Sequence, residues 1–321
     1  MHAYETTDAR ILHRLCEDIA RAQGLEMQSL CEGWVIRLRR GDVQRHIYAH
    51  NFELNSAVAR NIASDKAATA GVLAASDIPC IEHQLFRHPE ITTYVDPAGN
   101  WARMRQLAEQ WGWSVVLKAA ESSGGHRVLH ASGPRQLEAA AQALFTTERS
   151  ICLSPFYEAS REFRVIVLGG AVELLYGKAP PTVVGDGERR LLDLVLQAYE
   201  THVDAKAIAT LLAEDAAGAM LDWQRVPGAG ERVQLGWKHN LRLAGSVEIC
   251  DRQDVADLAL RAAAAINLCF GAVDVLEGEG GLRVLEINSG FMTTHFVRLV
   301  PDGEAIARRI YEKAILRMFD E

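Results

Sequence analysis

Residues 271–288, GAVDVLEGEGGLRVLEIN, constrain the fold of this chain more than any other segment, because they place polar side chains on two apolar strands joined by a glycine-rich turn. Strand side chains alternate faces with a period of two, so Glu286 and Asn288 share a face. A hairpin closing near Glu279 sets Asp274 opposite Glu286. Strand interiors disfavour Asp and Asn, and close carboxylates repel, so the pattern favours a hard cation between them.

Magnesium is the cation that these oxygen donors indicate. Mg²⁺ is usually held by one or two carboxylates together with substrate phosphates, so the hairpin predicts one half of a nucleotide site. The alternative is an edge hairpin whose polar face is in water.

Composition limits the class of protein. The 321 residues, 49% hydrophobic and 24% charged, suffice for two or three packed subdomains. The net charge is −8 and there is no Lys/Arg-rich block, so we expect no nucleic-acid partner. The six cysteines form no C-x-x-C pair, which argues against zinc and disulfides and for the reducing cytoplasm. The polar N-terminus and the lack of a long apolar run predict neither a signal peptide nor a membrane span.

The local patterns predict mixed helices and strands without repeats. Helices are expected over residues 8–23, 134–145, 189–220 and 302–319, with one or two more over 56–75. Strands are expected on both sides of Arg40-Gly41-Asp42, over 113–120, on both sides of Gly169-Gly170, and in the hairpin described above.

A candidate phosphate-binding loop lies in the middle of the chain. Lys118 ends an apolar strand, and the loop that follows has two serines and two glycines, Ser122, Ser123, Gly124 and Gly125. Glycines let the backbone approach an anion closely, and a lysine offers a point charge to phosphate. Neither the P-loop nor the dinucleotide pattern is present, and an ordinary glycine-rich turn is the alternative.

These motifs, in this order, resemble the ATP-grasp superfamily of carboxylate–amine ligases, especially the ATP-grasp region of cyanophycin synthetases and bifunctional glutathione synthetases. The resemblance covers residues 56–319 and rests on five segments: SAVARNIASDKAATAGVLAASDIPC, VVLKAAESSGGHRV, REFRVIVLGGAVELLYGKAPPTVVGDG, VPGAGERVQLGWKHNLRLAGSVEICD, and the VDVL and VLEINSG strands of the hairpin. It implies an α/β (α+β) ATP-grasp fold in which two α+β subdomains clasp ATP. The expected division is a small N-terminal α/β unit (1–55), a pre-lid helical region (56–110), a lid subdomain (111–155) and a C-terminal subdomain (156–321).

The resemblance also implies roles for individual residues. Lys66 and Lys118 would hold phosphates, with the loop of Ser122, Ser123, Gly124 and Gly125 closing over them. A hinge formed by Leu153, Ser154, Phe156 and Tyr157 would meet adenine through backbone groups, and Glu162 would bind the ribose. Lys178 would neutralise the terminal phosphates, Arg164 and Asn240 would face the reacting carboxylate, and Asp274, Glu286 and Asn288 would hold two magnesium ions, for which Mn²⁺ can substitute. Arg164 as a paired strand residue and Lys178 as a solvated lysine are the alternatives.

The chain departs from the family pattern at three places. Many relatives have an acidic residue where this chain has Ser154, and Pro155 after it lacks an N–H, which puts base selectivity in doubt. The N-L-x-x-G-G block that begins at Asn240 has Ala244 in place of a glycine. Ala272 stands where the D-alanine ligases have an arginine, so that subfamily fits poorly.

The activity implied by the resemblance is an ATP-dependent ligase that joins small, amino-acid-like carboxylate and amine substrates through an acyl phosphate. A phosphotransferase of the same fold and a non-catalytic ATP-binding module are the alternatives. The expected partners are small molecules, with no nucleic acid and no membrane, and the pattern is compatible with a homodimer. The sequence does not identify the two substrates, and His126, His239 and His295 are more often structural than catalytic in such positions.

Overall fold

The computed structural model describes residues 8–88, 100–120, 127–200, 221–237 and 246–320. The chain divides into two compact units built from separated segments. The first unit comprises Met1–His83, Phe163–Tyr176 and Ile249–Glu321, and the second comprises Gln84–Glu162 and Gly177–Glu248. Among the helices of the described ranges, none has the length and apolar character needed to cross a membrane.

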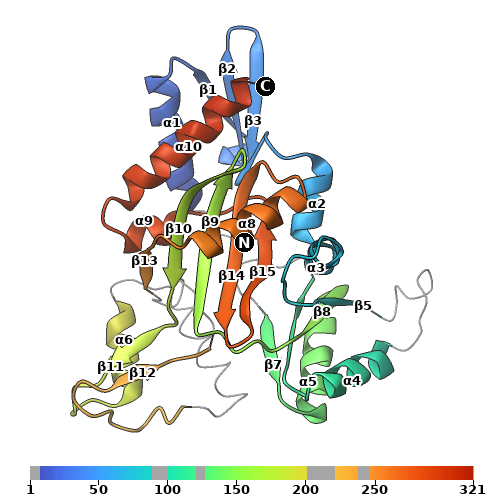
Figure 1. The fold of residues 1–321 in the computed structure, drawn as a ribbon. Helices are drawn as coiled ribbons and strands as arrows, with labels where there is room; N and C mark the ends of the chain where they lie inside the picture. Colours follow the sequence, from blue (N-terminus) through green and yellow to red (C-terminus); the bar gives the residue numbers. More distant parts are fainter. Residues whose placement is uncertain (1–7, 89–99, 121–126, 201–220, 238–245, 321) are drawn as a thin grey trace. The chain divides into compact units, whose positions relative to one another are not determined.

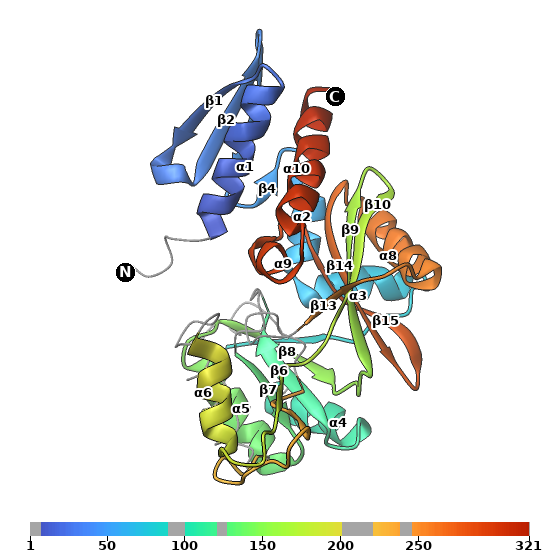
Figure 2. The ribbon, with the colours of Figure 1, turned by 90° about the vertical axis from the view of Figure 1, so that its left-hand side faces the viewer.

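The N-terminal part of the first unit is a helix beside a four-stranded antiparallel sheet in the order β1-β2-β3-β4 (Figure 2). Helix α1 spans Asp8–Ala22, which confirms the predicted helix, and the predicted turn at Gly41 joins β2 to β3. The sequence analysis did not predict the two edge strands. The strands are β1 (Glu26–Leu30), β2 (Val35–Arg40), β3 (Val43–Tyr48) and β4 (Asn51–Phe52).

The alanine-rich segment that follows forms two helices, α2 (Ala57–Ser64) and α3 (Lys66–Ala75). Asp65 separates them, because its backbone is extended and its carboxylate accepts hydrogen bonds from two amides of the first turn of α3. A carboxylate at an N-cap satisfies amides that have no partner within the helix. Ser56 caps α2 in the same way, its hydroxyl accepting from the Ala59 amide at 3.1 Å.

A five-stranded sheet in the order β13-β10-β9-β14-β15 forms the centre of the first unit (Figure 1). The ends of β9 and β10 carry the chain into the second unit. The predicted turn at Gly169-Gly170 joins these two strands, and both glycines have positive φ. The strands are β9 (Arg161–Leu168), β10 (Ala171–Lys178), β13 (Val247–Ile249), β14 (Phe270–Gly278) and β15 (Gly281–Asn288).

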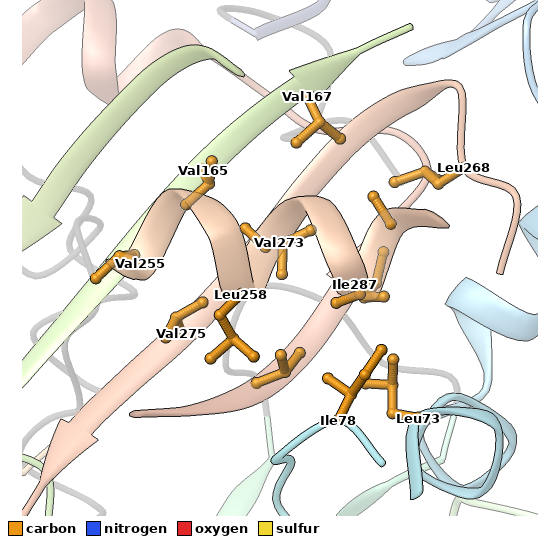
Figure 3. Packing of buried hydrophobic residues seen from close by; sticks show 14 of the residues in the cluster. Leu73, Ile78, Val165, Val167, Val255, Leu258, Leu268, Val273, Val275 and Ile287 are labelled. Carbon is orange, nitrogen blue, oxygen red and sulfur yellow. The ribbon is translucent and has the colours of Figure 1, made fainter. Parts of the chain in front are cut away.

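Helices cover both faces of this sheet. On one face, α3, the end of α2 and α8 (Gln253–Ala265) bury an aliphatic core that includes Leu73, Val165, Leu258 and Val273 (Figure 3). On the other face, α9 (Thr294–Leu299) and α10 (Gly303–Asp320) lie against the sheet (Figure 2). Helix α10 confirms the predicted closing helix. Asp274, Glu286 and Asn288, discussed below, alternate with core residues of the first face and therefore lie on the second.

The second unit has an antiparallel sheet in the order β5-β8-β6-β7, with α4 and α5 on one face. Helix α5 has the predicted bounds, with Pro134 at its first position, where a missing amide hydrogen costs nothing. A smaller core joins α6 to the β11–β12 ladder. The elements are β5 (Gln84–Arg87), α4 (Asn100–Gln110), β6 (Val115–Ala119), β7 (Val128–Ala131), α5 (Pro134–Phe145), β8 (Ser150–Pro155), β11 (Thr182–Val184), α6 (Leu191–Glu200) and β12 (Arg232–Gln234).

Candidate active site

The β14–β15 hairpin has the predicted register. Asp274 lies directly opposite Glu286, and Ala272 lies opposite Asn288, so the two carboxylates and the amide share one face of the sheet. The strands meet at the pair Gly278 and Gly281, which confirms a turn at Glu279. Figure 1 shows the two strands at one edge of the sheet. The register thus gathers three of the candidate metal ligands.

A β-bulge makes this register possible. Near the turn Val275 pairs with Val284, and continuing that ladder would place Leu285 opposite Asp274 and turn Glu286 toward the apolar core. The register shifts by one residue at this point, so Leu285 is the extra residue of a bulge. Val284 and Ile287 consequently both reach the core although they are three residues apart. That spacing, unlike the regular spacing of two, is the signal in the sequence that the sequence analysis missed.

Arg164 on β9 makes a two-pronged ion pair with Asp274. Its Nε lies 2.8 Å from Oδ1 and its Nη2 lies 2.6 Å from Oδ2. The Asp274 side chain is 1% exposed, so the carboxylate of this pair is almost completely shielded from solvent. Burial alone would lower the pKa of Arg164, but the charges of Asp274, Tyr176 and Glu286 and the hydrogen bonding of Arg164 to Asp274 outweigh it and hold that pKa well above its ordinary value. Arg164 is therefore a permanent cation beside the candidate metal ligands.

Asn288 lies between the two carboxylates, with Nδ2 3.4 Å from Asp274 Oδ2 and 3.4 Å from Glu286 Oε1. Rotating the amide would put its oxygen in that position instead. Among the described residues, no three His, Cys, Asp or Glu side chains form a group that could hold a metal, so a site here depends on the amide as third ligand.

Magnesium fits this donor set. An ionised carboxylate has about four acceptor positions, and the guanidinium engages one lone pair on each oxygen of Asp274. Two carboxylates and one amide oxygen are the hard ligands that Mg²⁺ prefers, with nucleotide oxygens completing the octahedron. Asp274, Glu286 and Asn288 are therefore the residues that would hold the ion.

Two segments that the sequence analysis did not single out support the hairpin. Pro79 and Ile81 bracket the bulge, because the Val284 amide donates to the Pro79 carbonyl and the Ile81 amide donates to the Val284 carbonyl, each at 2.9 Å. At the other end of the hairpin, the side chain of Asn55 contacts the backbone of both strand termini. Both contacts join segments that are distant in sequence.

In the second unit, Lys118 and Ser154 lie on the face of the sheet opposite the helices. Lys118 pairs with Cys152 and Val116 with Ser154, while the intervening Leu153 is fully buried in the core beneath α4 and α5. The side chain of Leu153 thus points away from Lys118, and only its backbone could meet a ligand on the face that carries Lys118. Lys118 itself is 5% exposed.

The end of β8, the predicted adenine hinge, is tied to its neighbours. The Phe156 amide donates to the Ser114 carbonyl at 2.8 Å, and Pro155 has no amide hydrogen. The Phe156 ring packs against His130 and Trp237 at centroid distances of 4.5 and 5.4 Å. The hinge therefore presents carbonyl acceptors and an aromatic ring more readily than amide donors.

Glu162 and Lys178, both in the second unit, form an ion pair in which each side chain is almost completely buried. Lys178 is thus not a solvated lysine. The pair brings the candidate ribose ligand and the candidate phosphate ligand together, with their charges neutralising each other.

The remaining candidates are dispersed or lie beyond the described residues. Lys66 begins α3 in the first unit and is buried, and His295 lies on α9. Tyr157 follows Phe156 after the end of β8. The calls on Ser122, Ser123, Gly124, Gly125, His126, His239 and Asn240 lie outside the described residues.

Comparisons with known proteins agree with the resemblance found in the sequence. No family model matches the chain. It is 40% identical over 81 residues to the tetrahydromethanopterin:alpha-L-glutamate ligase of Methanocaldococcus jannaschii, which covers 25% of this chain and 27% of that protein. It is 24% identical over 169 residues to the glutathione biosynthesis bifunctional protein GshAB of Clostridium perfringens, covering 49% and 22%. Cyanophycin synthetase of Trichormus variabilis is 23% identical over 178 residues, covering 55% and 18%.

The chain thus spans about a quarter or less of the length of the curated relatives it matches. Two solved structures have a similar fold over most of the chain. A bifunctional glutathione synthetase from Pasteurella multocida superposes with a TM-score of 0.57 at 16% identity, covering 97% of this chain and 45% of that one. A D-alanine–D-alanine ligase from Bacillus anthracis superposes with a TM-score of 0.53 at 11% identity, covering 84% and 70%. The predicted α+β fold is confirmed, and it is the fold of these ligases.

Proposed function

We propose that this chain, which has the ATP-grasp fold, is an ATP-dependent ligase that joins a carboxylate to an amine. The observation that supports this most strongly is the paired placement of Asp274 and Glu286 with Asn288 beside them on one sheet face. The named relatives are ligases, and the glutamate ligase and the glutathione protein among them support small, amino-acid-like substrates.

The proposed reaction has two steps. A carboxylate oxygen of the first substrate attacks the γ-phosphorus of ATP, and ADP leaves. The nitrogen of an amine then attacks the acyl carbon of the resulting acyl phosphate, and inorganic phosphate leaves with the electron pair of the broken C–O bond. The product is an amide, and the amine loses one proton.

The residues of the chain would act by binding and by neutralising charge. Asp274, Glu286 and Asn288 would hold magnesium, which when bound supplies positive charge to the phosphate oxygens. Arg164 would orient Asp274 through its two hydrogen bonds. In the second unit, Lys118 and Lys178 would bind phosphate oxygens, and Glu162 would accept hydrogen bonds from the ribose.

Several finer assignments belong to the same proposal. The loop of Ser122 to Gly125 would close over the phosphates and exclude water, since an acyl phosphate hydrolyses when water reaches it. Asn240 would face the reacting carboxylate. All six cysteines are free thiols, which supports a reducing compartment such as the cytoplasm.

The test is release of ADP and phosphate from Mg·ATP with amino acids and small carboxylates, singly and in pairs, followed by mass spectrometry. The ligase predicts release that requires two components and a product whose mass is their sum minus one water. A phosphorylated product formed from a single component would instead establish a phosphotransferase. Nucleotide binding without turnover for every pair would favour a binding module.

A further inference from the structure

Asn55 lies at the open end of the β14–β15 hairpin, and its side chain makes four hydrogen bonds to backbone atoms there. Its Oδ1 accepts from the amides of Cys269 and Phe270 at 2.8 and 3.0 Å. Its Nδ2 donates to the carbonyls of Phe270 and Ser289 at 2.6 and 3.3 Å. A primary amide has two donor hydrogens and two acceptor lone pairs, so the partners match its whole capacity.

The orientation of this amide follows from its partners. Backbone amides can only donate and backbone carbonyls can only accept, so exchanging the oxygen and nitrogen of Asn55 would place like groups against each other at all four contacts. The side-chain amide of Asn55 can therefore form these four hydrogen bonds in one orientation only. An aspartate of the same shape would keep the two accepted bonds and lose the two donated ones.

These bonds continue the hairpin ladder beyond its last backbone pair. Ala272 and Asn288 form that pair, and the Asn55 amide then links the next residue of one strand, Ser289, to the beginning of the other. The strands are close here, because a Cβ on Gly271 would lie 2.5 Å from the Asn288 carbonyl oxygen. The backbone of Asn288 is therefore held by the Asn55 bond to the next residue, Ser289, and by the close packing of its carbonyl against Gly271.

Asn55 is itself held in place by its neighbours in the chain. Ser56, the next residue, caps helix α2, and Phe52 packs edge-on against Phe270 at a centroid distance of 5.0 Å. A Cβ on Gly290 would lie 2.9 Å from the His50 carbonyl oxygen, so the segment after β15 also lies directly against this part of the chain. Asn55 therefore approaches the hairpin from a fixed backbone.

We propose that Asn55 is a positioning residue for the magnesium site, which sets metal affinity by fixing the backbone that carries Asn288. The proposal rests on the function proposed above, because it needs the metal to bind at Asp274, Glu286 and Asn288. Groups that orient metal ligands without touching the metal commonly change affinity by about 10- to 100-fold when they are removed.

The test compares three variants of the full chain: Asn55→Asp, Ser56→Ala and Glu286→Gln. Mn²⁺ affinity is measured by electron paramagnetic resonance of the free ion without added nucleotide, because nucleotide phosphates bind Mn²⁺ themselves, and thermal stability is measured alongside. Ser56→Ala is the matched control, because it removes the cap of α2 and weakens the same segment without touching the hairpin.

We expect Asn55→Asp to bind Mn²⁺ about tenfold more weakly or worse, while Ser56→Ala melts earlier than the parent and binds Mn²⁺ normally. Should Asn55→Asp fail to fold, Asn55→Ala removes all four bonds without setting a carboxylate against carbonyls, and a loss of affinity at least as large is expected.

Two results would overturn the proposal, and they have different meanings. Normal affinity in the Asn55 variant together with weak affinity in Glu286→Gln would leave the metal site intact and show that Asn55 has a structural role only. Normal affinity in Glu286→Gln as well would mean that the metal binds elsewhere, so the proposed function would lose its main support and the role of Asn55 would fall with it.

Discussion

The two units each hold a buried ion pair with one partner on β9, and the two pairs differ in kind. In the first unit Arg164 grips both oxygens of Asp274 with two nitrogens. In the second unit a single lysine nitrogen, that of Lys178, meets Glu162. A guanidinium fork fixes the orientation of a carboxylate, whereas an ammonium is a compact charge on a flexible stem that can change partners. The first pair is thus suited to orienting a metal ligand, and the second to releasing a lysine to an incoming phosphate.

The first pair also has a second carboxylate beside it, because Glu286 lies opposite Asp274 in the hairpin. Two carboxylates around one guanidinium favour the binding of a cation. The candidate phosphate ligand Lys118 belongs to the sheet of the second unit, where it is buried close to a strand end.

Among the tests of this contrast between the two ion pairs, replacing Arg164 should have the largest effect. Arg164→Leu leaves Asp274 buried without its fork, and we expect unfolding in urea with EDTA to become easier by about 3 to 5 kcal/mol. The double variant Arg164→Leu/Asp274→Leu is the control, since an apolar pair of similar size should recover most of that loss. A single variant as stable as the parent would show that the fork does not hold Asp274.

Removing the second carboxylate tests catalysis without breaking a buried pair. Glu286→Ala should lower ATP turnover by about 100-fold or more, because it removes a ligand of the metal ion that would stabilise the negative charge of the transition state. Glu286 is only half-buried, so the melting temperature should change little. Turnover is measured as ADP release, and a normal rate in this variant would contradict the metal assignment.

On the second unit, the contrast predicts an effect on nucleotide affinity. Lys118→Ala should weaken binding of a non-hydrolysable ATP analogue by about tenfold, because one charge-assisted bond to phosphate is lost. Calorimetry measures the affinity, and Lys118→Arg, which keeps the charge, is the matched control. Equal affinity in Lys118→Ala and the parent would make the following glycine-rich segment an ordinary turn.

The smallest expected effect concerns the Glu162–Lys178 pair. Glu162→Gln replaces a charged acceptor with a neutral one, so affinity for the ATP analogue should fall by only about threefold, because the hydrogen bond from the ribose becomes weaker and is not lost. The same analogue lacking the ribose 2′- and 3′-hydroxyls should bind the parent and the variant equally. A penalty in the variant that persists without these hydroxyls would assign Glu162 to Lys178 alone and not to the ribose.

The sequence predicted what depends on local pattern. Pro134 marks the start of α5, and the polar residues within the apolar strands of residues 271–288 predict the face that holds Asp274, Glu286 and Asn288. Strand β1, EMQSL, was missed because it lacks the alternation of a half-buried strand.

Contacts between residues that are distant in the sequence could not be predicted from local sequence patterns. Asn55 meets Phe270 across 215 residues, and no property of the local sequence distinguishes it from a turn asparagine. The assembly of the first unit from separated segments is likewise a matter of which distant segments pair, as with Cys80 and Val284.

The bulge at Leu285 has a consequence for how this hairpin tolerates insertions and deletions. Loss of Leu285 would restore a regular ladder in which Val284 still pairs with Val275 and Glu286 still pairs with Asp274. Loss of Ile287, two residues later, would instead move Asn288 into the apolar core. Among related sequences, a one-residue gap at position 285 is therefore compatible with an intact site, whereas a gap between Glu286 and Asn288 is not.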